Sequence, residues 1–371
     1  MNSTSPMKQA MRRNGLEWWL LFAALALTAV VYWAGLSGSY LFDDYPNIVD
    51  NNGVQPSHAS LPSLLNAAMS SPSSEFDRPL ASLSFAANYL ATGLNPYWMK
   101  LTNVVIHLLN GLLVFLLARL LLRSAPRVAS SATESRLIAT EGAHGTEESS
   151  IYIASEVAPT FAREGIVATL IAAGWMLLPI NLTAVLYVVQ RMESLANLFV
   201  LLGLFGYVAG RRRMLEPFAT STPFGSVHGR SGFWLCAASI TLPTAIGLLA
   251  KETAVMLPLY ALLVEWLLFG FRIAIPARRP FGEFETSRVT RTWDKRLIGL
   301  FLLVLALPLI VGLVWLLPGL LQPGHWSTRD FTLGTRLLSE ARIVVDYIVW
   351  TVVPMPQALS FYHDNFSIST G

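Results

Sequence analysis

Long apolar stretches separated by short polar segments dominate the chain. A helix rises about 1.5 Å per residue, so roughly 20 apolar residues cross the hydrocarbon core of a bilayer. Seven stretches approach this length, and they predict an all-α, polytopic transmembrane helix bundle. The predicted spans are Glu17–Leu36, Met99–Leu122, Gly165–Leu178, Met192–Gly210, Gly232–Ala250, Ala254–Phe271 and Leu297–Pro318.

The first two polar segments differ in character. Residues 37–98, the predicted first outer loop, contain two amphipathic stretches, Leu61–Met69 and Leu80–Leu90. Amphipathic helices of this kind can lie flat on a membrane surface. Residues 124–163 are rich in Ser, Ala, Thr and Glu and have no apolar periodicity. This composition predicts a flexible insertion on the inner side.

The C-terminal outer segment, residues 319–371, contains another amphipathic stretch, Gly334–Val353. The sequence shows no internal repeat, no phosphate-binding glycine loop and no metal-ligand spacing. We therefore expect a single transmembrane domain covering residues 1–371.

Composition agrees with a membrane protein and charge gives its orientation. The chain has 371 residues, of which 53% are hydrophobic and only 13% charged, and its net charge of +3 does not suggest a nucleic-acid partner. Basic residues cluster on the side of the N-terminus, as in Arg12-Arg13 and Arg211–Arg213. The positive-inside rule therefore places the N-terminus inside and residues 37–98 outside. The first apolar stretch is longer than a typical signal-peptide core, which favours a retained span.

Ionisable side chains near membrane depth are costly and suggest function. Asp43 and Asp44 directly follow the first span, where they are either a solvated turn or a carboxylate pair with chemistry. Asn103 and His107 share one face of the second span, either as interhelical hydrogen-bonding groups or as part of a site. The remaining polar candidates at the predicted outer face are Arg78, Gln190, Arg191, Lys251, Glu252, Arg342, His363 and Asp364.

Basic groups beside a carboxylate pair at the outer membrane surface suit a lipid substrate that carries a phosphate. Arg and Lys would hold the phosphate, where negative charge develops as it leaves. A carboxylate would remove the proton of an acceptor hydroxyl. The same aspartates could bind Mg²⁺ or Mn²⁺ through oxygen ligands, so a divalent cation is a possible cofactor at Asp43 and Asp44.

Several blocks of the sequence resemble one family. They are FDDYPNIVDN, RPLASLSFAANYLATGLNPYWMKLTNVVIHLLNG, LYVVQRMESLANLF, LLAKETAVMLPLYALLVE and LLSEARIVVDYIVW, followed by LSFYHDNFSIS. Together they resemble the GT-C superfamily of integral-membrane glycosyltransferases, and within it the bacterial relatives of the protein O-mannosyltransferases and of the transmembrane, tetratricopeptide-repeat O-mannosyltransferases.

The resemblance implies a function, a place in the cell and residue roles. The function is inverting transfer of a sugar from a polyprenyl-phosphate donor to an exported protein or envelope glycan, on the periplasmic or extracellular face of the bacterial inner membrane. Asp43 or Asp44 matches the catalytic aspartate, and Arg191, Lys251 and Arg342 match basic positions for donor phosphate. Relatives continue beyond the last outer helix, so we expect this chain to be a shortened version.

Two other classes stay open. A transporter or flippase would use the Asn103/His107 face as a path, and it would move substrate across liposomes without making a glycosyl product. An inactive scaffold of envelope glycan assembly would keep its biological function after both Asp43 and Asp44 are replaced.

Overall fold

The computed structural model describes residues 6–73, 77–124, 164–215, 225–278, 284–322, 331–355 and 367–369. Within this part of the chain, six helices are long and apolar enough to cross a membrane, which confirms the predicted polytopic helix bundle. These six spans are Gly15–Ser37, Pro96–Ser124, Val188–Leu215, Gly229–Leu248, Glu252–Phe269 and Lys295–Gly319.

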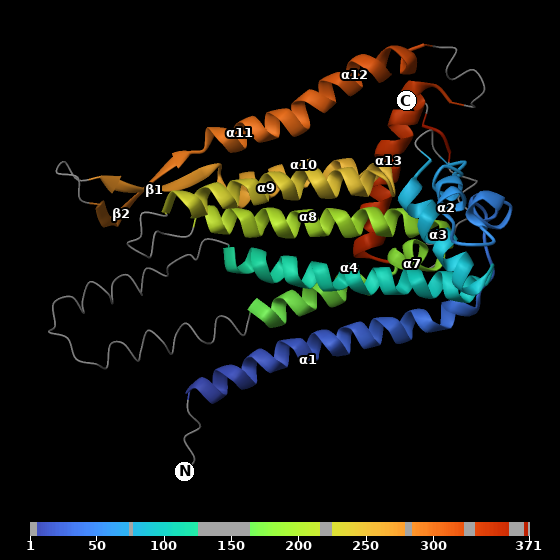
Figure 1. Ribbon diagram of the computed structural model, residues 1–371, viewed down its shortest axis with the longest axis horizontal. Helices are drawn as coiled ribbons and strands as arrows, with labels where there is room; N and C mark the ends of the chain where they lie inside the picture. Colours follow the sequence, from blue (N-terminus) through green and yellow to red (C-terminus); the bar gives the residue numbers. More distant parts are fainter. Residues whose placement is uncertain are drawn as a thin grey trace.

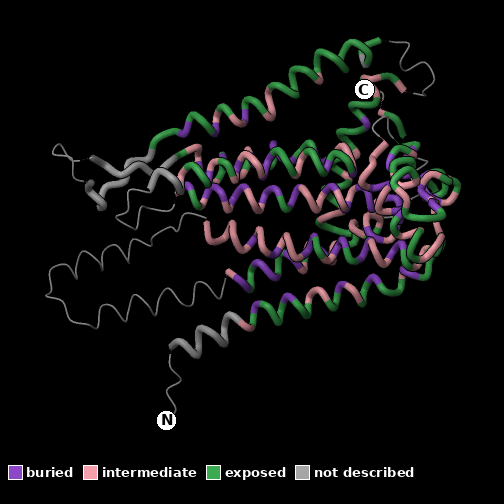
Figure 2. Tube along the Cα trace, in the orientation of Figure 1, coloured by how far each residue is buried: buried purple, intermediate pink, exposed green. Residues whose placement is uncertain are grey.

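The spanning helices run side by side along the long axis of the molecule (Figure 1). Helix α8 is central and largely buried, whereas α12 presents apolar side chains on its surface, as expected for contact with lipid (Figure 2). The helices of the bundle are α1 (Pro6–Trp33), α4 (Pro96–Ser124), α8 (Arg191–Leu215), α9 (Gly225–Leu248), α10 (Leu257–Val264), α11 (Lys295–Phe301) and α12 (Leu307–Leu320).

Small residues let α8 and α9 approach closely. A Cβ atom added at Gly210 would lie 2.9 Å from the carbonyl oxygen of Gly232, and one added at Gly203 would lie 2.7 Å from the carbonyl oxygen of Ser239. Close backbone approach at small residues is a common way for membrane helices to associate. The glycines of α8 thus explain why its neighbour packs along its length.

The predicted third span, Gly165–Leu178, is shorter than the others. Its helix covers Glu164–Met176 and belongs to the shorter apolar class. The chain turns after it and re-enters a helix at α7 (Asn181–Leu186). Asn181 donates a hydrogen bond from Nδ2 to the Trp175 carbonyl oxygen at 2.7 Å, which caps the end of the short helix. The predicted bounds agree with this helix to within two residues.

A fully buried ion pair lies near the C-terminal end of α8. Arg211 Nε lies 2.6 Å from Glu265 Oε2, and both side chains are completely buried. Tyr207 donates its hydroxyl to the same carboxylate oxygen at 2.7 Å, and the backbone N–H of Phe271 donates to Oε1 at 2.8 Å. Because every polar atom finds a partner, the pair ties α8 to the π-helical turn Glu265–Phe269.

The predicted inner segment between α10 and α11 contains a small sheet that the sequence analysis did not predict. Strands β1 (Arg272–Arg278) and β2 (Phe284–Trp293) pair antiparallel, with Arg272 opposite Trp293. The β-branched residues of Val289-Thr290 and Thr292 were an available signal. The predicted flexible insertion lies outside the described residues except for its first residue, Ser124.

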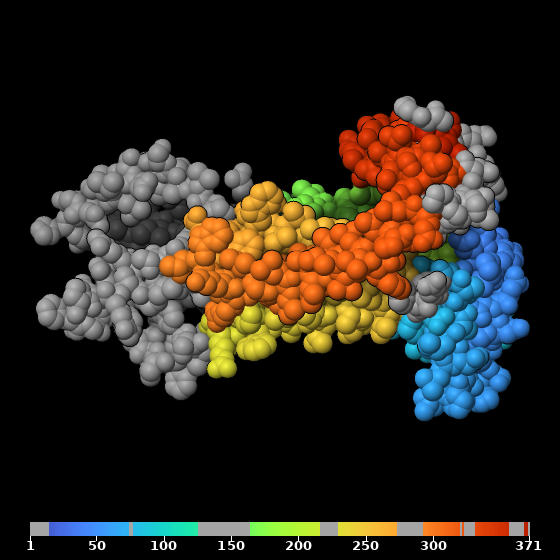
Figure 3. Space-filling view, turned by 90° about the horizontal axis from the view of Figure 1, so that it is seen from above, coloured from blue at the N-terminus to red at the C-terminus, as the bar shows by residue number. Residues whose placement is uncertain are grey.

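The amphipathic stretches of the outer segments form helices close to their predicted bounds. They are α2 (Leu61–Ala68), α3 (Pro79–Thr92) and α13 (Leu333–Val352). The first outer loop and α13 gather at the end of the bundle opposite the N-terminus and the β-hairpin (Figures 1 and 3). The segments that were predicted to share the outer face therefore lie at one end of the molecule.

Candidate active site

The two adjacent aspartates have opposite environments. Asp43 is exposed, whereas Asp44 is completely buried. The backbone turns sharply between the span and the pair, because Phe42 has φ 34° in the left-handed region and the Asp44 N–H donates to the Leu41 carbonyl oxygen at 2.8 Å. This turn sends one carboxylate toward solvent and the other into the protein.

The Asp44 carboxylate links the first outer loop to the residues that precede α8. Its Oδ2 accepts the Leu41 N–H at 3.0 Å, and its Oδ1 accepts the Val189 N–H at 2.7 Å. Burial raises the pKa of Asp44, and the backbone N–H donors and the charge of Lys100 oppose this rise. Asp44 is therefore built into the scaffold, and both of its oxygens are already engaged.

The pH dependence of stability should reveal this buried carboxyl group. A raised pKa means that the folded state holds the proton more tightly than the unfolded chain. The stabilisation is present below the unfolded pKa of about 3.9 and is lost as the pH rises through the folded pKa. Thermal unfolding in detergent should show a stability difference between wild type and Asp44→Asn that shrinks as pH rises. The exposed Asp50→Asn variant is the control, and a difference that grows with pH would contradict the assignment.

Asp43 is hydrogen-bonded to a tyrosine that the sequence analysis did not single out. The Asp43 backbone N–H donates to the Tyr187 hydroxyl oxygen at 2.7 Å. Burial raises the pKa of Tyr187 to about 12, and a hydrogen bond with the Asp43 side chain adds to this rise. The phenol therefore stays protonated at neutral pH and orients the exposed carboxylate. The sequence signal for Tyr187 was its place in the LYVVQRMESLANLF block, close to Arg191.

Lys100 is a second residue whose role the sequence analysis missed. It lies near the outer end of α4, where its side chain is buried and its charge acts on Asp44. A Cβ atom at Gly38 would lie 2.7 Å from Lys100 Nζ, so the glycine leaves space for the amine. A basic residue near the disfavoured outer face was the signal for it.

Arg191 occupies the centre of a buried hydrogen-bond network. Its Nε donates to Asn103 Oδ1 at 2.8 Å, Nη1 to the Ser84 carbonyl oxygen at 3.0 Å, and Nη2 to the Met99 carbonyl oxygen at 2.8 Å. The side chain is 0% exposed. These contacts join α8 to α3 and α4. Its assignment as a donor-phosphate ligand stays a prediction, because its present partners are all within the protein.

The polar face of α4 packs inside the bundle. Asn103 Nδ2 donates to the Tyr187 and Val188 carbonyl oxygens at 3.4 and 3.3 Å. His107 Nε2 lies 2.9 Å from the Met176 carbonyl oxygen, and its ring stacks on Trp175 with centroids 5.0 Å apart. Both side chains are buried. This geometry favours the interhelical hydrogen-bonding interpretation of the Asn103/His107 face, and a substrate role for it stays a prediction.

Two ion pairs at the same end of the bundle connect its elements. Arg78 contacts Glu252 through two donors, Nε at 3.3 Å and Nη2 at 3.0 Å. Lys251 Nζ lies 3.0 Å from Glu193 Oε2. The Leu80 N–H donates to the Leu249 carbonyl oxygen at 2.8 Å, so the start of α3 is fixed against the end of α9. The structure thus brings Arg78, Lys251 and Glu252 together, as the shared outer face predicted.

The other predicted site residues are less closely connected. Gln190 is half-buried in the turn before α8. Arg342 lies on α13, where Nη1 donates to the Ser367 carbonyl oxygen at 3.1 Å and to Ser369 Oγ at 2.7 Å. His363 and Asp364 lie outside the described residues, so their assignment stays a prediction.

The aspartate pair offers one open carboxylate for a metal ion. Within the described ranges, no group of three or more His, Cys, Asp or Glu side chains is arranged to hold a metal. Asp44 already accepts two N–H donors, whereas Asp43 faces solvent. Mg²⁺ commonly keeps several waters and takes one or two carboxylates plus substrate phosphate. A Mg²⁺ or Mn²⁺ ion at Asp43 and Asp44 therefore stays a prediction, and Asp43 is the carboxylate of the pair that faces solvent.

The fold and the site define a multi-pass membrane protein with polar side chains gathered at one end. Comparison with known proteins gives partial similarity to protein O-mannosyl-transferases. Tmtc1 of Drosophila melanogaster is 36% identical over 104 residues, which cover 27% of this chain and 12% of the relative. TMTC3 of Mus musculus is 32% identical over 103 residues, and Tmtc3 of Drosophila melanogaster is 32% identical over 127 residues.

These similarities support a relation to glycosyltransferases in general. The matched regions span only 11 to 13% of the length of these relatives. No protein-family profile matches the chain, and no solved structure matches it.

Proposed function

We propose that the protein is an inverting GT-C-type glycosyltransferase that moves a sugar from a polyprenyl-phosphate donor to an acceptor hydroxyl. The acceptor is an exported protein or an envelope glycan at the periplasmic or extracellular face of the bacterial inner membrane. The observation that carries the proposal is the division of the aspartate pair: Asp44 is buried inside the scaffold, and Asp43 is exposed and donates its backbone N–H to the Tyr187 hydroxyl. The similarity to protein O-mannosyl-transferases supports the reaction class.

In the proposed reaction, Asp43 acts as general base. It accepts the proton of the acceptor hydroxyl while that oxygen forms a bond to the anomeric carbon. The bond between the anomeric carbon and the phosphate oxygen breaks, and polyprenyl phosphate leaves with the bonding electrons. Arg78 and Lys251 at the same end of the bundle stabilise the departing phosphate. One displacement at the anomeric carbon inverts its configuration.

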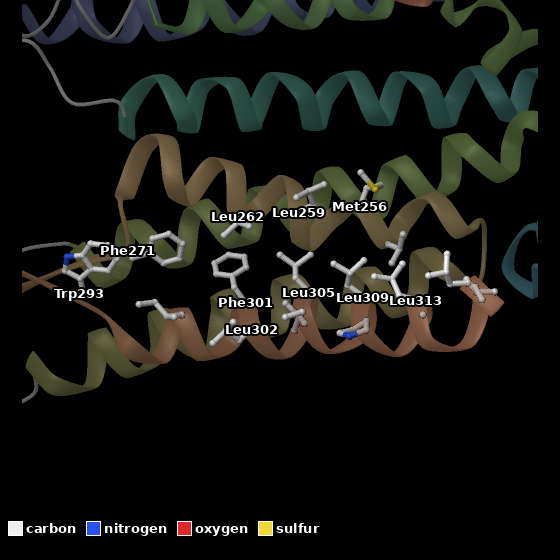
Figure 4. Close-up of a pocket in the computed structure, with 18 residues that line it drawn as sticks. Met256, Leu259, Leu262, Phe271, Trp293, Phe301, Leu302, Leu305, Leu309 and Leu313 are labelled. Atoms are coloured by element: carbon white, nitrogen blue, oxygen red, sulfur yellow. The ribbon is translucent and has the colours of Figure 1, made fainter. Parts of the chain in front are cut away.

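An apolar groove in the membrane region supports a donor with a long hydrocarbon chain. The groove has a volume of about 920 Å³ and lies between the 3-10 helix η5 (Glu252–Met256) with α10 on one side and α11–α12 on the other. Figure 4 shows Met256, Leu259 and Leu262 on one side facing Leu305, Leu309 and Leu313 on the other. Its first lining residue is Val255, three residues after Glu252. A polyprenyl chain in the groove would leave its phosphate close to Arg78 and Lys251.

Narrowing this groove should weaken binding of a long-chain donor. Gly312 lines the groove, and a Cβ atom there meets no other atom within 4 Å. Gly312→Leu should therefore fold normally and fill part of the space. We expect the KM for a polyprenyl-phosphate sugar to rise roughly tenfold, the equivalent of about two buried methylene groups.

A matched control lies on the same helix. Gly319 also has open space around its Cβ position but does not line the groove. Steady-state kinetics of Gly319→Leu should match wild type. Equal KM values for Gly312→Leu and wild type would show that the donor chain binds elsewhere.

Mass spectrometry of exported proteins and envelope glycans tests the proposed function in cells. Cells that lack the gene should lose one set of hexose-modified products, and the wild-type gene should restore it. A gene carrying Asp43→Asn should not. Identical glycan profiles in all strains would contradict the proposal.

A further inference from the structure

The two outer cations are each covered by a carboxylate. The Arg78 side chain is 15% exposed, and its partner Glu252 is 42% exposed. The Lys251 side chain is 23% exposed, and its partner Glu193 is 38% exposed. In both pairs the acidic residue is the more exposed member. The carboxylates therefore lie on the solvent side of the cations.

The two pairs form one connected cluster. Lys251 and Glu252 are neighbours in the sequence, and each belongs to a different pair. Arg78 Nη1 lies 3.2 Å from the sulfur of Met192, the residue next to Glu193. Thr253 Oγ1 adds a hydrogen bond to Glu193 Oε2 at 3.2 Å. We name Arg78, Glu193, Lys251 and Glu252 the carboxylate-covered cluster.

The backbone holds Arg78 in an unusual conformation. Asp77 and Arg78 have φ angles of 53° and 43°, both in the left-handed region that non-glycine residues seldom adopt. Such conformations persist where the surrounding structure imposes them, and they concentrate at functional sites. The conformation and the Leu80–Leu249 hydrogen bond set the base of the Arg78 side chain against the tip of the α9–η5 hairpin.

We propose that Glu252 and Glu193 occupy a phosphate-binding site and that the donor's phosphate displaces them on binding. The proposal rests on the lipid-phosphate donor proposed above. A guanidinium binds carboxylate and phosphate with the same two-donor geometry, so each can replace the other. Partly exposed ion pairs contribute little to stability, so the exchange has a small cost. Glu252, predicted as a phosphate-binding residue, is thus a competitor for Arg78 and sets the affinity for the donor.

Binding of farnesyl phosphate to the purified protein in nanodiscs tests this exchange without requiring sugar transfer. Glu252→Gln and Glu193→Gln keep the shape of each side chain and remove its charge. Each variant should bind farnesyl phosphate about two- to fivefold more tightly than wild type, the scale of a partly exposed ion pair. Farnesol, which lacks the phosphate, should bind all variants equally.

A matched control and a double variant make the result specific. Glu340 is 52% exposed and pairs at 3.6 Å with Arg336, which is 50% exposed, on α13, and Glu340→Gln should leave the affinity unchanged. The gain of Glu252→Gln should disappear in Arg78→Gln/Glu252→Gln, because the cation that the Glu252 substitution uncovers is lost. Unchanged or weaker binding in both single variants would overturn the exchange, as would an equal gain for farnesol. Tighter phosphate binding without any sugar transfer would uphold the exchange and overturn the proposed function.

Discussion

Replacement of Asp43 by Asn should lower the rate of sugar transfer by roughly 10²- to 10⁴-fold, the usual contribution of a general base. The substitution keeps the size of the side chain and removes its ability to accept the proton. Asp43 is exposed. Its backbone N–H donates to the Tyr187 hydroxyl and its carbonyl oxygen accepts from Asn47 Nδ2, and neither bond uses the carboxylate. The protein should therefore remain folded, and the loss should lie in kcat. A purified-enzyme transfer assay measures it directly.

Three companion variants make the assignment specific. Asp50→Asn changes an exposed aspartate in the same loop and should keep full activity. Tyr187→Phe removes the hydroxyl that orients Asp43 and should give a smaller loss than Asp43→Asn. Asp44→Asn should change thermal stability as well as rate, because it alters a buried group. Full activity in Asp43→Asn together with an inactive but stably folded Asp44→Asn would transfer the role of base to Asp44.

Replacement of Arg191 by Leu should destabilise the protein by about 3–5 kcal/mol, because it leaves buried acceptors without donors. The affected acceptors are Asn103 Oδ1 and the carbonyl oxygens of Ser84 and Met99. The loss should appear as a lower unfolding midpoint in detergent. Arg342→Leu, on the exposed face of α13, should change the midpoint far less.

The two interpretations of Arg191 differ in their readouts. If Arg191 binds phosphate, its replacement should raise the KM for the donor and leave thermal stability near that of wild type. Loss of a buried structural arginine would lower stability, and Lys would not restore it, because its compact ammonium group cannot span the acceptor positions that the planar guanidinium reaches. Normal stability of Arg191→Leu with a raised KM would support the phosphate role.

Hydropathy and charge predicted the membrane architecture because both are local properties of the sequence. Six spans and the amphipathic helices α2, α3 and α13 lie close to their predicted positions. The basic clusters also grouped the first outer loop and α13 on one side, and the structure places both at one end of the bundle. The β1–β2 hairpin was missed, since strands of 7 and 10 residues are too short to register in a search for membrane spans.

The details of the site depend on tertiary contacts that spacing alone does not encode. Asp43 and Asp44 are equivalent in the sequence, and only the turn at Phe42 and the Val189 N–H decide which one is buried. Arg191 has the same chemistry as Arg78, but its neighbours enclose it within the bundle. Lys100 and Tyr187 gain their roles only through proximity to the pair.

Those contacts also separate two functions that the sequence analysis had combined. Residues with buried partners, such as Asn103, His107 and Arg191, hold the helices in place. Asp43 and the carboxylate-covered cluster lie where an external substrate can reach them. The proposed chemistry rests on the exposed set, and a substrate role for the buried set stays a prediction.

The most direct test of the account is mass spectrometry of an acceptor peptide after incubation with the purified protein in proteoliposomes and a polyprenyl-phosphate hexose. The account predicts a peptide that is heavier by one hexose on a Ser or Thr hydroxyl, and almost none of this product with Asp43→Asn. An unmodified peptide with the wild-type protein, while the lipid donor crosses the bilayer, would contradict a transferase and identify a transporter.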